Sequence, residues 1–331
     1  MSERILIGMS GGIDSTYLAW LLKSRGHDVI GVHLRLNPLS NSAINQPMDL
    51  SLNELPLETE PNGETEKDLI QKASKLGIEL LFVELGSRFR QFVLEPFMGD
   101  YRAGITPNPC VVCNARVKFA ALSILAERVG AGHYATGHYA RATRHPTSGA
   151  KVISRSLDPR NDQSYFLCRL SSAALERAMM PLGDMRRDDV VAGALEEGLF
   201  RPSVKSSQDL CFAGTGGYTE ILRSFGYGPE PGPIVDVELG EVGCHNGILN
   251  FTIGQRRGLS IALGSPRYVI EIDRATNTVV IGPENFVYRR ALRADNLLWA
   301  DGLEPEKPAP FNVQIRSRHK ASPALVSPRP E

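Results

Sequence analysis

A short apolar run followed by a glycine-rich turn, close to the N-terminus, limits most strongly what this chain can fold into. Residues 5–9 (Ile-Leu-Ile-Gly-Met) have the pattern of a buried strand, and residues 10–12 (Ser-Gly-Gly) interrupt it. Residues 16–23 predict a helix that stops before Gly26, and residues 29–34 form a second apolar run. A strand–helix–strand unit of this kind predicts an open parallel sheet of the α/β class.

The turn at residues 10–12 is suited to bind a phosphate group. Glycines between a strand and a helix let backbone N–H groups approach a ligand, and the helix N-terminus adds a partial positive charge. An ordinary strand-to-helix turn is the alternative, but the pattern Ser-Gly-Gly-Ile-Asp-Ser at residues 10–15 is more specific than a glycine pair. It resembles the pyrophosphate loop of the ATP pyrophosphatase (PP-loop) enzymes, which adenylylate a carbonyl oxygen and release pyrophosphate. We therefore expect an ATP site here.

The composition is that of a globular protein without a strong overall charge. The chain has 331 residues, 42% of them hydrophobic and 22% charged, with a formal net charge of +0, so local basic patches would have to hold any nucleic acid. We find no signal peptide and no apolar run near the roughly 18 residues of a membrane span, which predicts a cytoplasmic protein without a membrane partner. Five cysteines in a reducing compartment favour catalysis, metal binding or burial over disulfides.

The first half of the chain continues the alternation of helices and strands. Ligands bind beyond the carboxyl ends of strands in an open α/β sheet, so the glycine turn, the cysteine-containing loop 104–114 and the turn after residue 136 should share one edge. The segment 37–63 is expected to be a long loop near the ATP site. Helices are predicted over residues 64–76, 87–98, 115–128, 172–180 and 186–197, and strands over residues 79–85, 133–138 and 151–157.

The composition changes after Tyr227. Residues 228–233 are rich in Pro and Gly and predict a linker, and the short alternating stretches beyond it are typical of a small β-barrel or sandwich. We therefore expect three domains: a PP-loop catalytic domain at residues 1–205, a central linking domain at 206–272 that carries Cys211, and a β-barrel-like C-terminal domain at 273–331.

Two of the five cysteines lie in distinctive loops. Cys113 closes the pattern Asn-Pro-Cys-Val-Val-Cys and stands where the helix 115–128 is expected to begin, a position that lowers the pKa of a thiol and enriches the reactive thiolate. Cys211 lies in Ser-Gln-Asp-Leu-Cys-Phe. Burial as a small apolar side chain is the alternative for any cysteine, and it is our interpretation of Cys168 and Cys244.

Six motifs occur in order along the chain, and together they carry a family resemblance. The chain resembles the tRNA-specific 2-thiouridylases (the MnmA/TrmU family) from about residue 4 to about residue 320. The motifs are Ser-Gly-Gly-Ile-Asp-Ser, Thr-Pro-Asn-Pro-x-x-x-Cys-Asn, Ala-Thr-Gly-His-Tyr-Ala-Arg, Asp-Gln-Ser-Tyr-Phe-Leu, Ser-Gln-Asp-Leu-Cys-Phe and Phe-Thr-Ile-Gly-Gln-Arg-Arg-Gly-Leu.

The resemblance implies a reaction on tRNA. ATP, with Mg²⁺, adenylylates O2 of the wobble uridine (position 34) in tRNAs for Lys, Glu and Gln, and a persulfide sulfur replaces the activated oxygen, which yields 2-thiouridine, AMP and pyrophosphate. A wobble base lies in a single-stranded loop and can enter a pocket without opening a duplex. The implied partners are tRNA and a sulfur donor, either a cysteine desulfurase or a relay protein, and the enzyme is expected to be a monomer.

The resemblance also assigns residues. Cys211 would receive the sulfur as a persulfide, and Cys113 would be the nucleophile that attacks it or forms the transient disulfide. ATP would be bound by Gly8, Met9, Ser10, Gly11, Gly12, Ile13, Asp14 and Ser15, with Leu34 and Gly137. The target base would face Asn108, Pro109 and Cys110, and tRNA would contact His138, Asn161, Asp162, Gln163, Arg316 and Ser317.

The chain departs from the family pattern at several positions. Cys110 stands where family members usually have Asp, and with Cys113 and Cys211 it offers a ligand set for a [4Fe–4S] cluster with one open iron. Zinc is the competing metal, although a fourth ligand is not evident. The segment 37–63 lacks the usual Trp and acidic residues, Ser317 replaces a common Tyr, and the short C-terminus predicts an incomplete barrel.

Two other function classes are weighed against sulfur transfer. Another PP-loop activity, such as an ATP-dependent ligase or amidotransferase, would need neither cysteine. A degenerate tRNA-binding or sulfur-carrier protein would need neither the intact loop at residues 10–15 nor both thiols. ATP-dependent tRNA 2-thiolation is therefore the function that the sequence favours.

Overall fold

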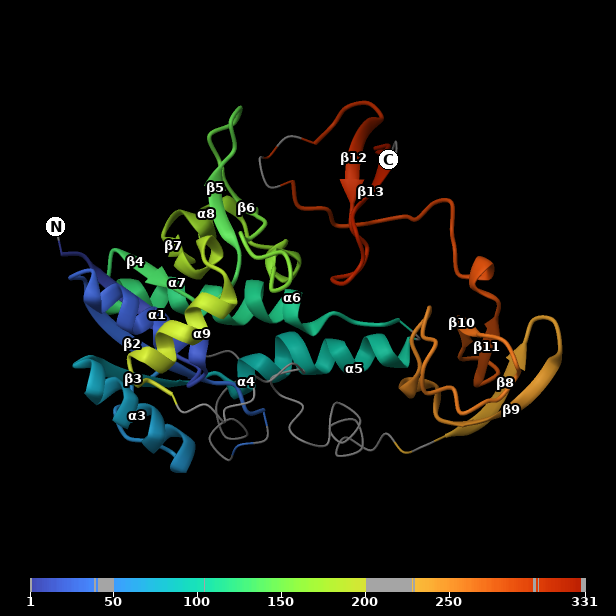
Figure 1. Cartoon of the computed structure of the whole chain (residues 1–331), viewed down its shortest axis with the longest axis horizontal. Helices are drawn as coiled ribbons and strands as arrows, with labels where there is room; N and C mark the ends of the chain where they lie inside the picture. The colour runs from blue at the N-terminus through green and yellow to red at the C-terminus, as the bar shows by residue number, and fades with distance from the viewer. Residues whose placement is uncertain are drawn as a thin grey trace. The chain divides into compact units, whose positions relative to one another are not determined.

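The computed structural model describes residues 2–38, 40, 51–103, 105–200, 228, 230–299, 302 and 304–328 (Figure 1). The chain divides into two compact units. Unit 1 consists of residues 1–92, 110–206 and 298–331, and unit 2 consists of residues 93–109 and 207–297. The predicted segment around Cys211 lies outside the described residues.

Unit 1 is built on a five-stranded sheet with the strand order β3-β2-β1-β4-β7. Every neighbouring pair in this sheet is parallel, which confirms the predicted open α/β sheet. The strands β1, β2 and β3 agree with the apolar runs that predicted them to within about one residue. The strands are β1 (Arg4–Gly8), β2 (Asp28–Arg35), β3 (Glu79–Glu84), β4 (His133–Ala135) and β7 (Ala178–Met179).

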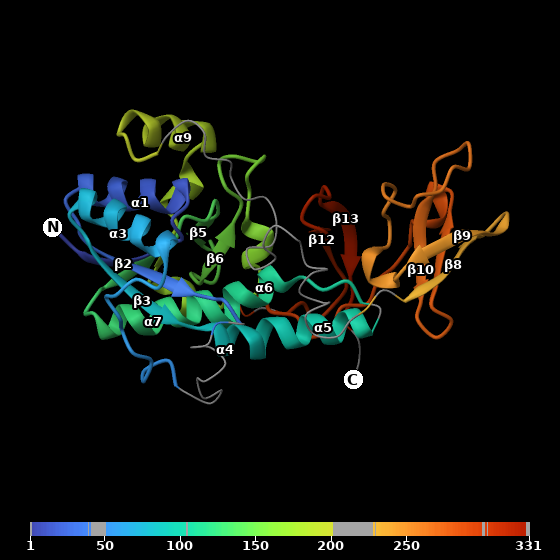
Figure 2. The ribbon, with the colours of Figure 1, turned by 90° about the horizontal axis from the view of Figure 1, so that it is seen from below.

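Helices cover both faces of this sheet, with α1 (Ile13–Ser24) and α3 (Glu64–Leu76) on one face and α7 (Phe119–Arg128) on the other (Figure 2). Ile5, Ile7 and Phe82 are fully buried and pack with α1 and α3 in one cluster. Helix α3 has the predicted bounds because Gly77 caps it with φ +62, a left-handed conformation that suits glycine. The core of unit 1 therefore lies in the two helix–sheet interfaces.

The prediction of a loop at residues 104–114 is wrong for the second half of this segment. A continuous helix runs from Pro109 to Arg128, as α6 (Pro109–Cys113), the π-turn η2 (Asn114–Lys118) and α7. Proline begins it because the first helical position needs no N–H and favours the φ of proline. This helix is also long and apolar enough to cross a membrane, contrary to the sequence expectation. Half of its apolar stretch is buried, as in the core helix of a soluble protein.

Two other predicted helices differ from the observed elements, one between β3 and Cys110 and one after β4. The helix predicted at residues 87–98 is observed as α4 (Gly86–Phe89), η1 (Arg90–Leu94) and α5 (Glu95–Arg102). The helix predicted at residues 172–180 ends early, because residues 178–179 join the sheet as β7. The remaining elements here are β5 (Arg141–Arg144), β6 (Lys151–Ser154), η3 (Ser164–Leu167), α8 (Ser172–Glu176), η4 (Pro181–Asp184) and α9 (Arg187–Glu196).

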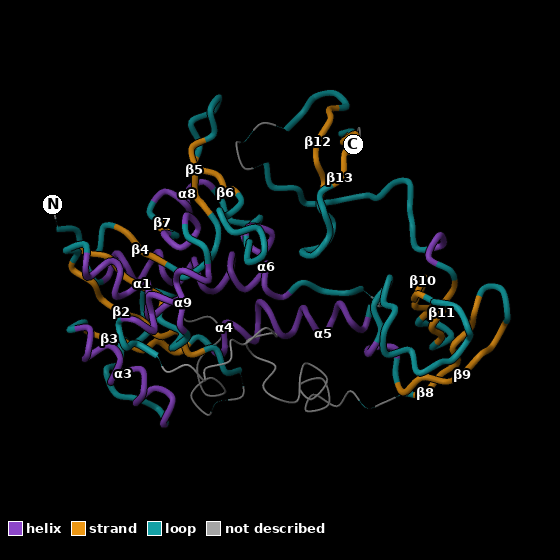
Figure 3. The backbone as a smooth tube through the Cα atoms, in the orientation of Figure 1, coloured by secondary structure: helices purple, strands orange, loops and turns teal. Residues whose placement is uncertain are grey.

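Unit 2 contains a four-stranded sheet with the order β10-β11-β8-β9, which confirms the predicted β-rich region (Figure 3). Ile234, Val269 and Ile281 form its core. The predicted linker is wrong from residue 231, where β8 begins, and the sheet continues across the predicted domain boundary at residue 272. The strands are β8 (Pro231–Asp236), β9 (Gly240–Asn246), β10 (Tyr268–Asp273) and β11 (Thr278–Gly282), with short η5 (Ile248–Asn250) and η6 (Glu284–Phe286).

The C-terminal strands β12 (Ala309–Val313) and β13 (Ser322–Val326) form a separate antiparallel pair within unit 1. The three-domain division at residues 205 and 272 stays a prediction.

Among the described glycines of unit 1, Gly183 in η4 allows the closest backbone approach. A Cβ at this buried position would lie 1.9 Å from the carbonyl oxygen of Ala140. We expect Gly183→Ala to lower the free energy of unfolding by roughly 1–3 kcal/mol, the usual cost of overpacking, because the neighbouring atom is backbone. Thermal unfolding checks this. Gly132→Ala is the control, since a Cβ there meets nothing within 4 Å, and equal melting temperatures for the two variants would contradict the prediction.

Candidate active site

The turn between β1 and α1 is closed by its own hydroxyl groups. Gly11 has φ +82, which glycine adopts without strain, and Gly12 is the N-cap of α1. The hydroxyl of Ser15 accepts a hydrogen bond from the Ser10 N–H and donates to the Gly12 carbonyl, both at 3.2 Å. The Ser10 and Ser15 hydroxyl oxygens are also 3.2 Å apart. The first N–H groups of a helix have no partner within it, so this turn presents donors to an anion.

The turn lies where the strand order of the sheet reverses. The chain passes from β1 to β2 on one side, and β4 pairs with β1 on the other side. Ligands of open α/β sheets bind at this point, outside the carboxyl ends of the strands. Gly137 follows β4, and a Cβ there would lie 3.2 Å from the Ser15 nitrogen and 3.3 Å from the Asp14 carbonyl carbon. The structure thus brings the residue 8–15 segment, Gly137 and Leu34, near the end of β2, to one edge.

The carboxylate of Asp14 has two partners that the sequence analysis did not single out. Its Oδ1 accepts a hydrogen bond from the Tyr139 hydroxyl at 2.7 Å and lies 3.5 Å from Nε of Arg187 on α9. Tyr139 is 2% exposed, and burial together with Asp14 raises its pKa well above the usual range, so the phenol stays a donor. Tyr139 lies inside the motif at residues 135–141 and could have been found there, whereas no motif marks Arg187.

A second cation lies beside the same turn. Nζ of Lys72, on α3, is 3.3 Å from the Gly11 carbonyl oxygen, pairs with Asp68 at 2.7 Å, and stands 4.5 Å from the centroid of the Phe200 ring. The helical pattern of residues 64–76 gave no reason to separate this lysine from other surface charges. Lys72 and Arg187 place positive charge on the turn from two different helices.

The thiols lie on successive turns of the helix that begins at Pro109. Cys113 is 4% exposed and Cys110 is half-buried. Cys110, not Cys113, occupies the first turn, which corrects the expectation that Cys113 stands at the helix start. The field of a helix N-terminus falls off within one turn, so it acts mainly on Cys110.

Asn114 links the cysteine helix to the following loop. Its side chain is 4% exposed, and Nδ2 donates to the Phe166 carbonyl at 3.1 Å. Its Oδ1 is buried without a hydrogen-bond partner in the described part of the chain. A buried carbonyl oxygen without a donor is uncommon. Asn114 is therefore a further candidate site residue, next to Cys113 in the chain.

His138 is held as a neutral imidazole. Its Nδ1 lies 2.9 Å from the Thr136 hydroxyl, and its ring centroid is 5.7 Å from that of Phe119. Burial, with a smaller effect of Lys118, lowers the pKa of His138 to about 3. At neutral pH this side chain can accept or donate a hydrogen bond but carries no charge.

This shift predicts a pH dependence of stability. An unfolded histidine takes up a proton below about 6.5, whereas native His138 does not until about pH 3, so the free energy of unfolding should decrease as the pH falls through this window. Denaturant unfolding at pH 7, 6 and 5 measures it. His138→Gln should flatten the dependence, and the same substitution at the exposed His319 should not. Parallel pH curves for wild type and His138→Gln would contradict the assignment.

The segment at residues 155–165 is held by its own polar side chains. The Asp162 carboxylate is 9% exposed and accepts from the Ser156 N–H at 3.0 Å and from the Ser164 hydroxyl at 2.8 Å. Asn161 donates to Asp158 at 2.9 Å, and Oε1 of Gln163 accepts from the Tyr139 N–H at 2.9 Å. Three of the residues predicted to contact tRNA lie in this segment, and all three therefore also hold the loop in shape: Asn161, Asp162 and Gln163.

A segment 150 residues further along the chain lies against this loop. Nη2 of Arg155 donates to Oε1 of Gln314 at 2.7 Å, and the Tyr165 hydroxyl donates to the Ile315 carbonyl at 3.1 Å. Gln314 in turn donates to the carbonyls of Arg316 and Ser317, at 3.0 and 2.9 Å. The structure thus brings the two segments predicted to contact tRNA, 161–163 and 316–317, to one side of unit 1.

Metal ligands are not gathered in the described ranges: no group of three His, Cys, Asp or Glu side chains there could hold an ion. The predicted cluster ligands Cys110 and Cys113 lie on one helix, and the third, Cys211, lies outside those ranges.

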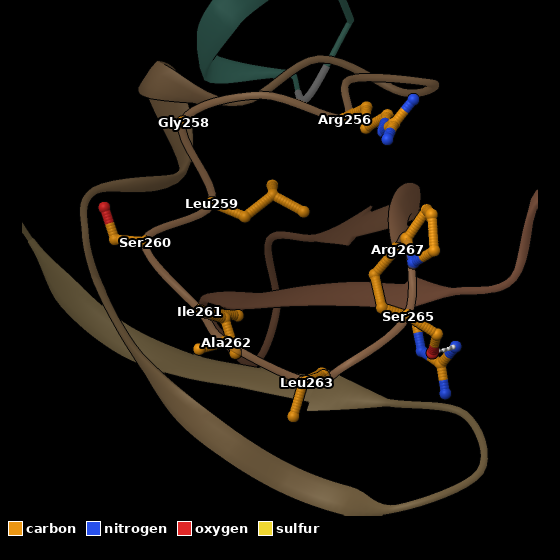
Figure 4. A pocket seen from close by; sticks show the side chains of 10 residues that line it. Arg256, Gly258, Leu259, Ser260, Ile261, Ala262, Leu263, Ser265 and Arg267 are labelled. Carbon is orange, nitrogen blue, oxygen red and sulfur yellow. Dashed lines mark hydrogen bonds between the residues drawn. The ribbon is translucent and has the colours of Figure 1, made fainter.

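Unit 2 contains a hollow of about 410 Å³, lined by residues 256, 258–263 and 265–267 (Figure 4). The motif at residues 251–259 supplies Arg256 and Leu259 to this lining. Arg267 is already neutralised, by Asp236 and by Glu238 at 2.9 Å. Arg256 is the remaining cation among the lining residues.

Comparison with known proteins decides the family. The family described as "tRNA methyl transferase HUP domain" matches residues 3–215, and "tRNA methyl transferase PRC-barrel domain" matches residues 225–283. The tRNA-specific 2-thiouridylase MnmA of Roseiflexus castenholzii is 38% identical over 98% of this chain and 89% of its own length. MnmA of Heliobacterium modesticaldum is 37% identical, with 98% and 82% covered, and MnmA of Acidothermus cellulolyticus is 38% identical, with 98% and 87% covered.

The chain belongs to the tRNA-specific 2-thiouridylase family. Within this 2-thiouridylase, the HUP match contains the turn at residues 10–15, the cysteine helix and, in sequence, Cys211, while the PRC-barrel match contains the four-stranded sheet. Among solved structures, a 4-thiouridine synthetase–RNA complex with bound ATP is 17% identical with a TM-score of 0.35, covering 68% of this chain and 50% of that one. A TM-score this low adds nothing to the assignment.

Proposed function

We propose that this protein is an ATP-dependent tRNA-uridine 2-sulfurtransferase that thiolates the wobble uridine of tRNAs for Lys, Glu and Gln. One observation supports it most: a turn that presents N–H donors at the strand-order reversal belongs to the same unit as a helix with two thiols. Either feature alone fits other functions, whereas sulfur transfer to an activated carbonyl uses both.

Residues 8–15 bind the phosphates of ATP in this proposal. The N–H groups at the start of α1 contact them, and the positive charges of Lys72 and Arg187 offset the charge of the leaving pyrophosphate. The Asp14 carboxylate would hold the Mg²⁺ that accompanies ATP, since carboxylate oxygens are ligands that Mg²⁺ prefers. O2 of the uracil attacks the α-phosphorus, the bond between the α-phosphorus and the bridging oxygen breaks, and pyrophosphate leaves with the electron pair.

The two cysteines then deliver sulfur. Cys211 carries it as a persulfide received from a cysteine desulfurase or a relay protein. The Cys113 thiolate attacks the inner sulfur, so a Cys113–Cys211 disulfide forms and hydrosulfide leaves. Hydrosulfide adds to C2 of the adenylylated uracil, and AMP departs with the oxygen. An external thiol reduces the disulfide for the next cycle.

The target base faces Asn108, Pro109 and Cys110, and the neutral His138 contacts the RNA as a hydrogen-bonding group. Residues 161–163 and 316–317 contact tRNA near the anticodon, and the chain acts as a monomer in the cytoplasm. A [4Fe–4S] cluster on Cys110, Cys113 and Cys211 is the alternative route for sulfur, and anaerobic purification followed by iron analysis distinguishes it from the persulfide route.

An ATP–pyrophosphate exchange assay tests this function. Exchange should require tRNA that contains an unmodified wobble uridine, because adenylylation needs the O2 acceptor. Exchange with a small molecule instead of tRNA would favour a ligase or amidotransferase, and tRNA binding without any exchange would favour a carrier or binding protein.

A further inference from the structure

Arg88 and Arg116 hold two like charges against one aromatic ring. Arg88 lies on α4, directly after β3, and Phe92 follows one turn later on η1. Arg116 lies on η2, one turn beyond Cys113. The guanidinium carbons of Arg88 and Arg116 are 4.7 and 4.9 Å from the centroid of the Phe92 ring, and Nε of Arg88 donates to the Arg116 carbonyl at 3.2 Å. We call Arg88 and Arg116 the arginine pair.

The arginine pair has no acidic partner within the described ranges, where neither residue forms an ion pair with a carboxylate. Other arginines of unit 1 are compensated: Arg35 binds Glu58 and Glu66, and Arg177 binds Glu127 at 2.6 Å. Burial, and then the charge of Arg116, lower the pKa of Arg88 from its ordinary value. An anion bound by both guanidinium groups would offset this repulsion.

We propose that the arginine pair binds a phosphodiester group of the tRNA backbone. The guanidinium group offers planar N–H forks that match phosphate oxygens, and stacking on Phe92 fixes both groups before binding. Arg116 is exposed, so its N–H groups are accessible to a large ligand. This proposal rests on the proposed function, because it requires tRNA to be the substrate.

The position of the pair separates it from the ATP phosphates. Arg88 follows β3, and β3 lies two strands from β1 in the order β3-β2-β1, which is about 10 Å across the sheet. Arg116 instead shares its helix with the thiol of Cys113. The pair is therefore placed to hold the RNA backbone close to the sulfur chemistry, and it should not take part in adenylylation.

Direct binding of tRNA to the full-length protein tests the proposal. We expect Arg88→Gln/Arg116→Gln to weaken the Kd for unmodified tRNA about tenfold at moderate salt and to reduce the slope of log Kd against log salt by about 1. Arg4→Gln is the matched control, since Arg4 pairs with Asp28 at the amino end of β1, and it should leave the slope unchanged. Arg116→Gln alone, at an exposed position, should show a smaller change in the same direction.

The KM for ATP in pyrophosphate exchange should stay the same in the double variant. A wild-type slope and Kd in the double variant would overturn the proposal, and so would a raised KM for ATP with unchanged tRNA binding. Binding is measured without sulfur transfer, so the two claims can fail separately. If tRNA binding depends on the arginine pair but the wild-type protein makes no 2-thiouridine, the proposed function is wrong and the arginine-pair proposal stands.

Discussion

Replacing Cys113 with alanine should abolish 2-thiouridine formation while ATP–pyrophosphate exchange continues. We expect a loss on the order of a thousandfold or more, because removal of a nucleophile leaves only the binding and electrostatic contributions to catalysis. The side chain is 4% exposed and small, so alanine leaves only a small gap in the core. Thiolation of an unmodified tRNA transcript with a persulfide donor measures the loss.

The two assays separate chemistry from folding. Cys168→Ala is the control and should keep both activities, since Cys168 is an exposed cysteine of the same unit. The burial expected from the sequence for Cys168 and Cys244 is wrong, because both are exposed. Thiolation by Cys113→Ala would contradict the nucleophile assignment. If Cys113→Ala loses both exchange and thiolation, Cys113 instead maintains the fold of the helix and its role in sulfur transfer is not supported.

Replacing Asp14 with asparagine should reduce ATP–pyrophosphate exchange by about 100-fold or more, the usual effect of removing one preorganised electrostatic group. Asparagine keeps the size of the side chain and can still accept the hydrogen bond from Tyr139. It loses the charge that pairs with Arg187 at 3.5 Å and that would hold Mg²⁺. We therefore expect kcat to fall and the KM for ATP to rise together, with an unchanged melting temperature.

Asp28→Asn is the matched control for this prediction. Asp28 pairs with Arg4 at 2.7 Å at the amino end of the sheet, far from the turn at residues 10–15 along the strand. The Asp28→Asn variant should catalyse ATP–pyrophosphate exchange at the wild-type rate. Full exchange by Asp14→Asn would show that the carboxylate only supports the Tyr139 contact.

The sequence predicted unit 1 well because its strands are buried on both faces and its helices have clear stop signals. Ile5, Ile7 and Phe82 are fully buried, so the apolar runs stand out, and Gly77 ends α3 where expected. The failures came from tertiary effects. Residues 178–179 form a strand only because β4 offers an edge, and Pro109 begins a helix although two prolines suggested a loop.

The site was predicted where a motif marks it and missed where only the fold does. The segment 8–15 and Gly137 were predicted from their patterns as ATP-binding residues, and the structure places them at one sheet edge; their role stays a prediction. Arg187, Lys72 and the arginine pair lie on helices whose charges look like ordinary surface charges in sequence. Their approach to Asp14, Gly11 and Phe92 depends on packing that no local pattern records.

Mass spectrometry of tRNA from a bacterial strain that lacks its own 2-thiouridylase tests the central claim most directly. Expression of this chain should restore 2-thiouridine at the wobble position, and neither Cys113→Ala nor Cys211→Ala should restore it. If the wild-type chain restores no 2-thiouridine, or adds a methyl group in place of sulfur, the account of this protein as an ATP-dependent sulfurtransferase is wrong.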